Sequence, residues 1–254
     1  MNLSFILPVY NSQDFIEESL KILIHYIEKL ELIQDVQIVI VNDGSKDKTL
    51  DIITNFVNSN QYEKITFDIV SYEKNMNIGF AIRKGIEKVK NDVVIIMDSD
   101  LPFELNIIDD SLKLINSCCL VSVDRTKKAD SYKVGFVRLI LHKGLIFLIK
   151  LMFGKYLKGI DDFVAGFKVI RKNLLDKIKQ NLISNTSLIH FEIILYTVIE
   201  NMKSDQKCDI GFVFPVLKVE TNQKTTYKFF KILEVVWKII FELFEIKKRV
   251  DKIV

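Results

Sequence analysis

The first half of the chain alternates short apolar runs with segments of helical periodicity, and this alternation limits the possible folds most. The apolar runs have the length of buried strands and cover residues 3–9, 36–41, 65–71, 93–97 and 120–123. The segments between them predict helices over residues 12–32, 48–58, 79–90 and 104–117, the first capped by Ser12. Strands that alternate with helices form a mostly parallel sheet with helices on both faces. We therefore predict an α/β fold.

The second half is less regular, although no shift in composition marks a domain boundary. The polar segment 124–133 predicts a loop, whereas residues 163–170 and 210–219 predict extended chain. Residues 171–179 and 188–202 predict helices. We expect one domain over residues 1–227, made of a first half at 1–126 and a second half at 127–227, followed by an amphipathic helix in residues 228–254.

Two segments carry more apolar surface than a solvated helix needs. Residues 136–153 are almost all apolar, but Arg138, His142, Lys143 and Lys150 fall on one side of a helix, within roughly 140°. These charges argue against a membrane-spanning helix. A core helix with a solvated basic face and a helix lying on a membrane surface both remain open. The aromatic face of the 228–249 helix requires a partner, which is the domain, another subunit or a bilayer.

Composition excludes some classes of protein. The 254 residues carry a net charge of +3 without a basic stripe in the first hundred residues, so nucleic acid is not expected as a partner. Cys118, Cys119 and Cys208 lack metal-ligand spacing, and we interpret them as small core side chains in a reducing compartment, without a disulfide or zinc framework. Residues 1–9 predict a strand and not a signal peptide, which favours the cytoplasm.

Asp98-Ser99-Asp100 follows the apolar run 93–97 directly. Ligands of open α/β sheets bind outside the carboxyl ends of the strands. Paired carboxylates there suit a hard cation such as Mg²⁺ or Mn²⁺, which completes its shell with substrate phosphates and water. A triplet of this kind standing alone also marks an ordinary turn after a strand, so its meaning depends on its neighbours.

Three other segments place polar groups at the same sheet edge: Pro8-Val9-Tyr10-Asn11, Asn42-Asp43-Gly44-Ser45-Lys46-Asp47-Lys48-Thr49, and residues 75–85 with Asn75, Asn77, Ala81, Arg83 and Gly85. Together with the acidic triplet they resemble the family 2 glycosyltransferases of the GT-A fold, a Rossmann-like mostly parallel sheet. The closer resemblance is to the branch of dolichyl-phosphate mannose synthase and the bacterial polyprenyl-phosphate glycosyltransferases. It is strong over residues 3–126 and weaker to about residue 227.

The resemblance implies that the first half binds a nucleotide diphosphate sugar linked to UDP or GDP. Asp43 would contact the base, Arg83 the phosphates, and Asp98 with Asp100 an Mg²⁺ or Mn²⁺ ion. The implied donor-binding residues are Pro8, Tyr10, Asn11, Asp43, Asn75, Arg83, Asp98, Ser99 and Asp100. Two positions depart from the family pattern: Asn77 stands where glycine is usual, and Pro102 replaces a glutamine that assists the metal.

The second half resembles the acceptor side of the branch. The residues that would bind phosphate or acceptor are Arg125, Arg138, Gly166, Lys168 and Lys224, and Asp162 could orient donor hydroxyls. Arg125, Asp162 and Glu192 are the implied catalytic residues. Ile194 and Glu220 depart from the pattern, since the branch has an acid at the first position and a basic residue at the second.

These residues predict an inverting sugar transfer to a polyprenyl phosphate or a glycan, in polysaccharide or glycolipid synthesis at the inner face of the membrane. A phosphate acceptor requires no general base, whereas a hydroxyl acceptor would use Glu192 first or Asp162 second. His142 and His190 are further candidates, although a lone histidine on an apolar helix is usually structural. A non-catalytic scaffold and a sugar-phosphate nucleotidyltransferase are the competing classes, and the second lacks its glycine-rich loop here.

Overall fold

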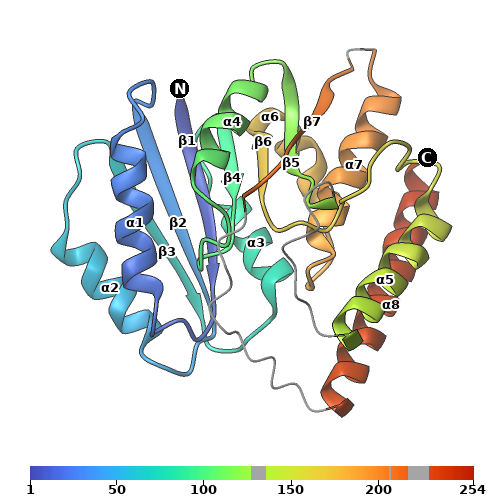
Figure 1. Ribbon diagram of the computed structural model, residues 1–254, viewed down its shortest axis with the longest axis horizontal. Helices are drawn as coiled ribbons and strands as arrows, with labels where there is room; N and C mark the ends of the chain where they lie inside the picture. The colour runs from blue at the N-terminus through green and yellow to red at the C-terminus, as the bar shows by residue number, and fades with distance from the viewer. Residues whose placement is uncertain (127–135, 206, 217–228) are drawn as a thin grey trace.

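A seven-stranded sheet forms the centre of the molecule (Figure 1). The computed structural model describes residues 1–126, 136–205, 207–216 and 229–254, with the backbone alone at 136–142 and 229–233. The strands are β1 (Asn2–Val9), β2 (Asp35–Asp43), β3 (Ile65–Tyr72), β4 (Val93–Ile96), β5 (Cys118–Val123), β6 (Lys168–Arg171) and β7 (Asp209–Val213). Their order is β3-β2-β1-β4-β6-β5-β7. All pairs are parallel except those of β6, which runs antiparallel to both β4 and β5. The predicted mostly parallel sheet is confirmed.

Helices cover both faces of this sheet, as the sequence predicts. They are α1 (Ile16–Glu28), α2 (Thr49–Ser59), α3 (Ile78–Ile86), α4 (Asn106–Leu114), α5 (Phe136–Phe153), α6 (Lys172–Ile178), α7 (Ile189–Lys203) and α8 (Phe229–Ile253), with a 3₁₀ turn at Lys179–Asn181. Side chains of α1, α2 and α4 share one apolar core with one face of the sheet. Side chains of α3, α5, α6, α7 and α8 form a second core on the other face.

Two predicted elements differ from the structure. The first helix begins at Ile16 and ends at Glu28, and Ser12 does not cap it with its side chain, because its hydroxyl bonds to the carbonyl oxygen of Tyr10. The predicted strand 163–170 is shortened to β6, because residues 163–167 form a buried loop. The loop bonds within itself: Val164 N–H donates to Asp162, and the Lys168 ammonium donates to the Ala165 carbonyl oxygen.

The expectation for the cysteines is wrong for two of the three. Cys119 and Cys208 form a disulfide with their Cα atoms 5.7 Å apart, and Cys118 is free. The reason is topological: β5 pairs in parallel with β7, which brings the start of β5 beside the residue that precedes β7. The two cysteines are 89 residues apart in the chain. No local spacing could reveal a contact that only the sheet order creates.

The two apolar segments form helices that lie side by side at one edge of the molecule (Figure 1). Ile149 and Phe153 of α5, and Leu243, Ile246 and Val250 of α8, are fully buried in the second core. The domain itself therefore covers one face of each helix. Within the described residues, no helix has both the length and the hydropathy needed to cross a membrane.

Candidate active site

Polar side chains gather where β1, β2 and β4 end, at the lower side of the sheet in Figure 1. Because β1 pairs in parallel with both β2 and β4, their carboxyl ends lie at one edge of the sheet. Two groups can be distinguished there. The first, the Asp43 group, comprises Asp43, Asn75 and Met76. The second, the Asp98 group, comprises Asp98, Arg125, Asp162, Gly166 and Lys168.

Asp43 lies buried at the end of β2 and organises the loop that leads to α3. Its carboxylate accepts hydrogen bonds from the Met76 N–H at 2.7 Å and the Asn75 side-chain amide at 2.9 Å. Burial raises the pKa of Asp43, and the Met76 N–H opposes that shift. Gly44 follows with φ +64°, and a Cβ atom there would lie 2.5 Å from the Lys74 carbonyl carbon. The glycine therefore lets the two loops pack backbone to backbone.

The loop after β1 is joined to the loop after β2. Asn11 accepts a hydrogen bond from the Lys46 N–H at 2.8 Å and donates its own N–H to the Ser45 hydroxyl. Tyr10 is exposed, and Pro8, the second-last residue of β1, is half-buried. Thr49, fully buried at the start of α2, accepts the Ser12 N–H at 2.7 Å. The two predicted donor segments thus form one connected surface.

The segment that opens α3 contacts the second half of the chain. Asn77 has φ +72°, so the residue that replaces the usual glycine does adopt a left-handed backbone. Arg83 donates to the side-chain oxygen of Asn185. A Cβ atom on Gly79 would lie 2.5 Å from the carbonyl oxygens of Ser184 and Thr186. Arg83, predicted to reach donor phosphates, is therefore bound to the loop before α7.

Asp98 is half-buried, and its carboxylate lies against the backbone of Gly166. A Cβ atom on Gly166 would stand 2.6 Å from Asp98 Oδ2. Burial raises the pKa of Asp98 to about 6, and the neighbouring Asp100 adds to the shift, while Arg125 and Lys168 oppose it. Ser99 is buried and Asp100 is exposed. Leu101 turns the chain with φ +48°.

Arg125 and Asp162 form a bidentate ion pair beside Asp98. Arg125 Nε and Nη2 donate to the two carboxylate oxygens at 2.6 and 3.0 Å, and the Arg125 N–H donates to Oδ2 at 3.2 Å. Asp162 is 5% exposed. Burial alone would raise the pKa of Asp162, but the Arg125 guanidinium holds this pKa below its usual range. The pair joins the end of β5 to the loop before β6, and it fixes the direction of the guanidinium.

Lys168 brings a buried positive charge into the same group. Its ammonium is fully buried and donates to the Ala165 and Phe167 carbonyl oxygens at 2.6 and 3.4 Å. Burial lowers the pKa of Lys168 to about 7, and Arg125 lowers it further, while Asp162 and Asp98 oppose the shift. His190, on α7, is buried close enough to feel the same charges, and burial holds its pKa well below the usual value.

Glu192 of α7 lies in a third group. It is fully buried and accepts the Ser184 N–H at 2.8 Å and the Ile183 N–H at 3.2 Å. Burial raises the pKa of Glu192 to about 8. Glu242 of α8 binds the same loop: it accepts the Asn185 N–H at 3.0 Å and the Thr186 hydroxyl at 2.6 Å. We call residues 184–186 the bridging loop, because α3, α7 and α8 all bind it.

The structure thus sorts the predicted site residues into groups. One group lies together, whereas Arg83 and Glu192 each bind the bridging loop. The group that lies together consists of Asp98, Arg125, Asp162, Gly166 and Lys168. The side chains of Arg138 and His142, and the residues Glu220 and Lys224, lie outside what the structure describes. Ile194 is buried in α7. Sequence reasoning missed Asn185 and Glu242, because polar residues in a loop or on a helix give no signal of a distant partner.

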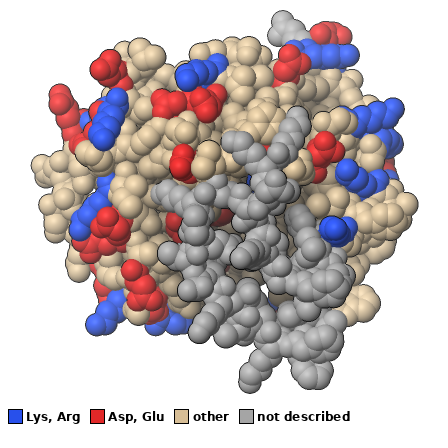
Figure 2. Space-filling view, viewed as in Figure 1, with Lys and Arg blue, Asp and Glu red and all other residues tan. Residues whose placement is uncertain are grey.

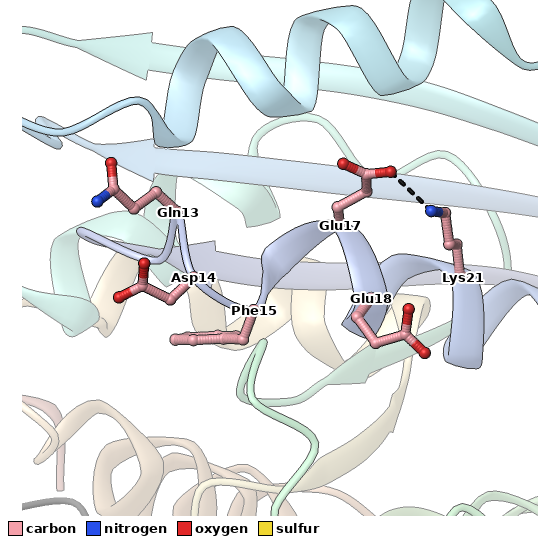
Figure 3. Close-up of a pocket in the computed structure, with 6 residues that line it drawn as sticks. All are labelled: Gln13, Asp14, Phe15, Glu17, Glu18 and Lys21. Atoms are coloured by element: carbon pink, nitrogen blue, oxygen red, sulfur yellow. Dashed lines mark hydrogen bonds and ion pairs between the residues drawn. The ribbon is translucent and has the colours of Figure 1, made fainter.

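A shallow hollow of about 260 Å³ lies at the start of α1 (Figure 3). It is lined by Gln13, Asp14, Phe15, Glu17, Glu18 and Lys21, and Figure 3 shows Glu17 paired with Lys21. None of these side chains belongs to the Asp43 or Asp98 group. The hollow therefore shares no residue with the two groups, although Gln13 bonds to Asp47 and Lys48 in the loop after β2.

The donor set of the Asp98 group suits a divalent cation with few protein ligands. Among the described residues, no cluster of three or more His, Cys, Asp or Glu could hold a metal alone. Asp100 nevertheless raises the pKa of Asp98, and a cation bound beside the two carboxylates would relieve that repulsion. Mg²⁺ is bound typically by one or two carboxylates plus substrate phosphates and water. Asp98 and Asp100 meet that requirement.

Comparison with known protein families matches residues 4–179 to the family described as Glycosyl transferase family 2. A dolichyl-phosphate beta-glucosyltransferase of Trichomonas vaginalis is 29% identical over 181 residues, which are 67% of this chain and 53% of that protein. An uncharacterized glycosyltransferase of Bacillus subtilis is 28% identical over 193 residues, 70% of this chain and 52% of its own length. The chain spans about half the length of these curated relatives.

Solved structures share the fold. Glucosyl-3-phosphoglycerate synthase of Mycobacterium tuberculosis with UDP has a TM-score of 0.66 at 15% identity, covering 97% of this chain and 80% of that one. The same enzyme with Mn²⁺, UDP and glucosyl-3-phosphoglycerate gives 0.64 at 14% identity, covering 97% and 80%. The sheet order, the helices on both faces and these neighbours are those of the GT-A fold. With its family match over most of its length, the chain belongs to glycosyl transferase family 2.

Proposed function

We propose that this protein is an inverting glycosyltransferase, which moves a sugar from a nucleotide diphosphate sugar to a polyprenyl phosphate or to a glycan. The observation that carries the proposal is the Asp98 group together with Asp100: two neighbouring carboxylates that follow a strand, near a fixed guanidinium and a buried ammonium. The dolichyl-phosphate beta-glucosyltransferase among the relatives supports the phosphate acceptor. We further propose that the sugar donor is linked to UDP or to GDP.

The Asp43 group would hold the nucleoside. Asp43 fixes the loop through Met76 and Asn75, so base and ribose would rest between this loop and the surface of Pro8, Tyr10 and Asn11. Asp98, Ser99 and Asp100 would then lie at the ribose and the diphosphate. Because these loops are already fixed, they can orient the donor, and no loop has to become ordered at each turnover.

Asp98 and Asp100 would hold Mg²⁺ or Mn²⁺, and a structural neighbour contains Mn²⁺ with UDP. When bound, such an ion neutralises the charge of the diphosphate leaving group. Arg125, which Asp162 fixes in place, would add a positive charge at the same oxygens. Gly166 would leave room for the sugar beside Asp98, while Arg138, Lys168 and Lys224 stay proposals for the acceptor side.

In the transfer, an acceptor oxygen attacks the anomeric carbon from the face opposite the diphosphate. The new glycosidic bond forms as the bond to the diphosphate breaks, and its electron pair leaves with the diphosphate. The first two candidate bases already have protein partners: Glu192 binds the Ser184 N–H, and Asp162 binds Arg125. This favours an acceptor that is already an anion, such as a phosphate, which needs no base. If that phosphate is carried by a polyprenyl lipid, the enzyme would act at a membrane surface.

Thermal unfolding with UDP- and GDP-sugars, each with and without Mn²⁺, tests the donor side. A ligand that binds only the native state raises the melting temperature, by about 5–10 °C at a hundredfold excess over Kd. We expect one nucleotide to act and to require the metal. Asp100→Asn should remove the effect, whereas Asp110→Asn, an exposed aspartate on α4, should retain it.

If no nucleotide shifts the unfolding curve at millimolar concentration, the enzyme proposal is wrong and a non-catalytic scaffold becomes the better hypothesis. If one nucleotide does shift the curve, transfer to polyprenyl phosphate is assayed next. Activity of Glu192→Gln with a phosphate acceptor would support transfer without a base. Its loss, in protein that still binds the nucleotide, would argue for Glu192 as the base.

A further inference from the structure

The outer faces of α5 and α8 expose large apolar side chains that the domain does not cover. On α8, Trp237, Phe241 and Phe244 are 70%, 66% and 54% exposed. On α5, Phe147 and Leu151 are 70% and 71% exposed. We call these five side chains the α5–α8 face. Isolated exposed residues need no explanation, but aromatic residues concentrated on neighbouring helices indicate a binding surface.

The spacing on α8 shows that this face is a stripe and not a frayed end. Trp237, Phe241 and Phe244 follow each other at steps of four and three, and Lys248 continues the series. At about 100° per residue these four fall opposite Leu243, Ile246 and Val250, which are fully buried. The helix is therefore apolar on two opposite sides, and only one of them packs on the protein.

The charge of the same helices points to the kind of partner. The two helices, residues 136–153 and 229–253, contain 9 of the 36 Lys and Arg residues but only four of the 33 Asp and Glu residues. They thus carry a net charge of +5, and the rest of the chain a net charge of −2. Figure 2 shows Lys and Arg side chains at the right-hand edge, over the region of α5 and α8 in Figure 1. Lys143, Lys150 and Lys248 are exposed among the apolar side chains.

We propose that the α5–α8 face binds the surface of a bilayer rich in anionic lipid, with its aromatic side chains below the headgroups and its lysines at their phosphates. Aromatic residues interleaved with lysines are typical of helices that lie in the membrane interface. The long lysine side chains extend to the headgroups while the apolar groups insert. A second copy of the chain fits less well, since a two-fold interface would bring two helix pairs of the same net positive charge together.

The inference stands apart from the proposed activity, because no nucleotide, metal or acceptor enters it. It does suit that activity, since both helices begin at the side of the molecule where β1 and β2 end (Figure 1). A vesicle-binding measurement without nucleotide and metal therefore tests the surface alone. Its failure would leave the donor-binding result untouched, and the reverse also holds.

Trp237 is the only tryptophan in the chain, so its fluorescence reports directly on the face. We expect its emission to shift to the blue and the full chain to sediment with vesicles of phosphatidylglycerol, and to do so far less with phosphatidylcholine. The variant Phe241→Ser/Phe244→Ser should weaken binding at least about tenfold. Leu32→Ser, at an 86% exposed position outside both helices, should bind like the natural chain.

A matched pair of charge reversals keeps the test independent of the apolar variant. Lys248 and Lys113 are 70% and 77% exposed, and each pairs with an acid three residues earlier in its helix. Lys248→Glu should weaken binding at least about fivefold, and Lys113→Glu on α4 should not. Equal binding to both lipids, or equal effects of the two reversals, would overturn the proposal. A blue shift that grows with protein concentration without vesicles would overturn it in favour of a second copy.

Discussion

Gly166 shows how one missing side chain shapes the site. Because a Cβ atom there would stand 2.6 Å from Asp98 Oδ2, we expect Gly166→Ala to displace that carboxylate. Metal-dependent nucleotide binding, measured by calorimetric titration, should weaken at least about tenfold, a loss of ~1.4 kcal/mol. Gly144→Ala on α5 is the control, since a Cβ atom there meets nothing within 4 Å. It should leave binding unchanged and stabilise its helix by about 0.5–1 kcal/mol. Equal binding by both variants would contradict the assigned geometry.

Glu192 predicts a dependence of stability on pH. Its pKa is raised to about 8 in the native state, so between about pH 4.5 and 8 the native state holds a proton that the unfolded state has lost. The free energy of unfolding should therefore fall as pH rises through that window, by up to ~1.4 kcal/mol per pH unit, and level off above it. Urea unfolding of the natural chain and of Glu192→Gln at pH 5, 6.5 and 8 measures the difference. Parallel pH profiles would show that Glu192 titrates normally.

At the scale of elements, Glu242 ties α8 to the bridging loop. Glu242→Ala removes the acceptor of the Asn185 N–H and of the Thr186 hydroxyl, and we expect it to lower the free energy of unfolding by about 2–4 kcal/mol. Glu245→Ala, one turn further along α8, breaks only an exposed ion pair with Lys248 and should cost less than about 1 kcal/mol. Denaturant unfolding of the two variants checks this. Similar losses would mean that the loop does not depend on α8.

The elements also differ in how far the sequence alone predicts them. Strands and helices of the first half follow from local periodicity, and the strand-end positions of Asp43 and Asp98 follow from the parallel sheet. The partners of Arg83 and Glu192 do not, since both contact the bridging loop, which has no periodic pattern. The sequence does not show where the buried loop 163–167 ends and β6 begins. An apolar run has the same sequence pattern whether its backbone pairs in a sheet or forms a loop that bonds within itself. Residue type and motif therefore identify the candidate site residues in the sequence, whereas the contacts between them are known only from the fold.

At the scale of the whole molecule, the disulfide joins the start of β5 to the chain after α7. Its reduction, or Cys208→Ser, should lower the free energy of unfolding by about 2–4 kcal/mol, because the open form frees a long loop in the unfolded state. Cys118→Ser leaves the bond intact and serves as the control. Thermal unfolding with and without reductant measures the effect. An unchanged melting temperature on reduction would show that the pair contributes nothing to stability.

The position of β6 has a consequence for the order in which the protein can be assembled. Since β6 inserts between β4 and β5, the strand that precedes Asp98 keeps an open edge until Lys168–Arg171 has left the ribosome. During translation, residues 1–126 can complete the β3-β2-β1-β4 half of the sheet but cannot close the acidic site. An unpaired edge invites pairing with other chains. A ribosome-bound chain from which residues 168–171 have not emerged should therefore depend on chaperones in a way that a chain exposing them does not.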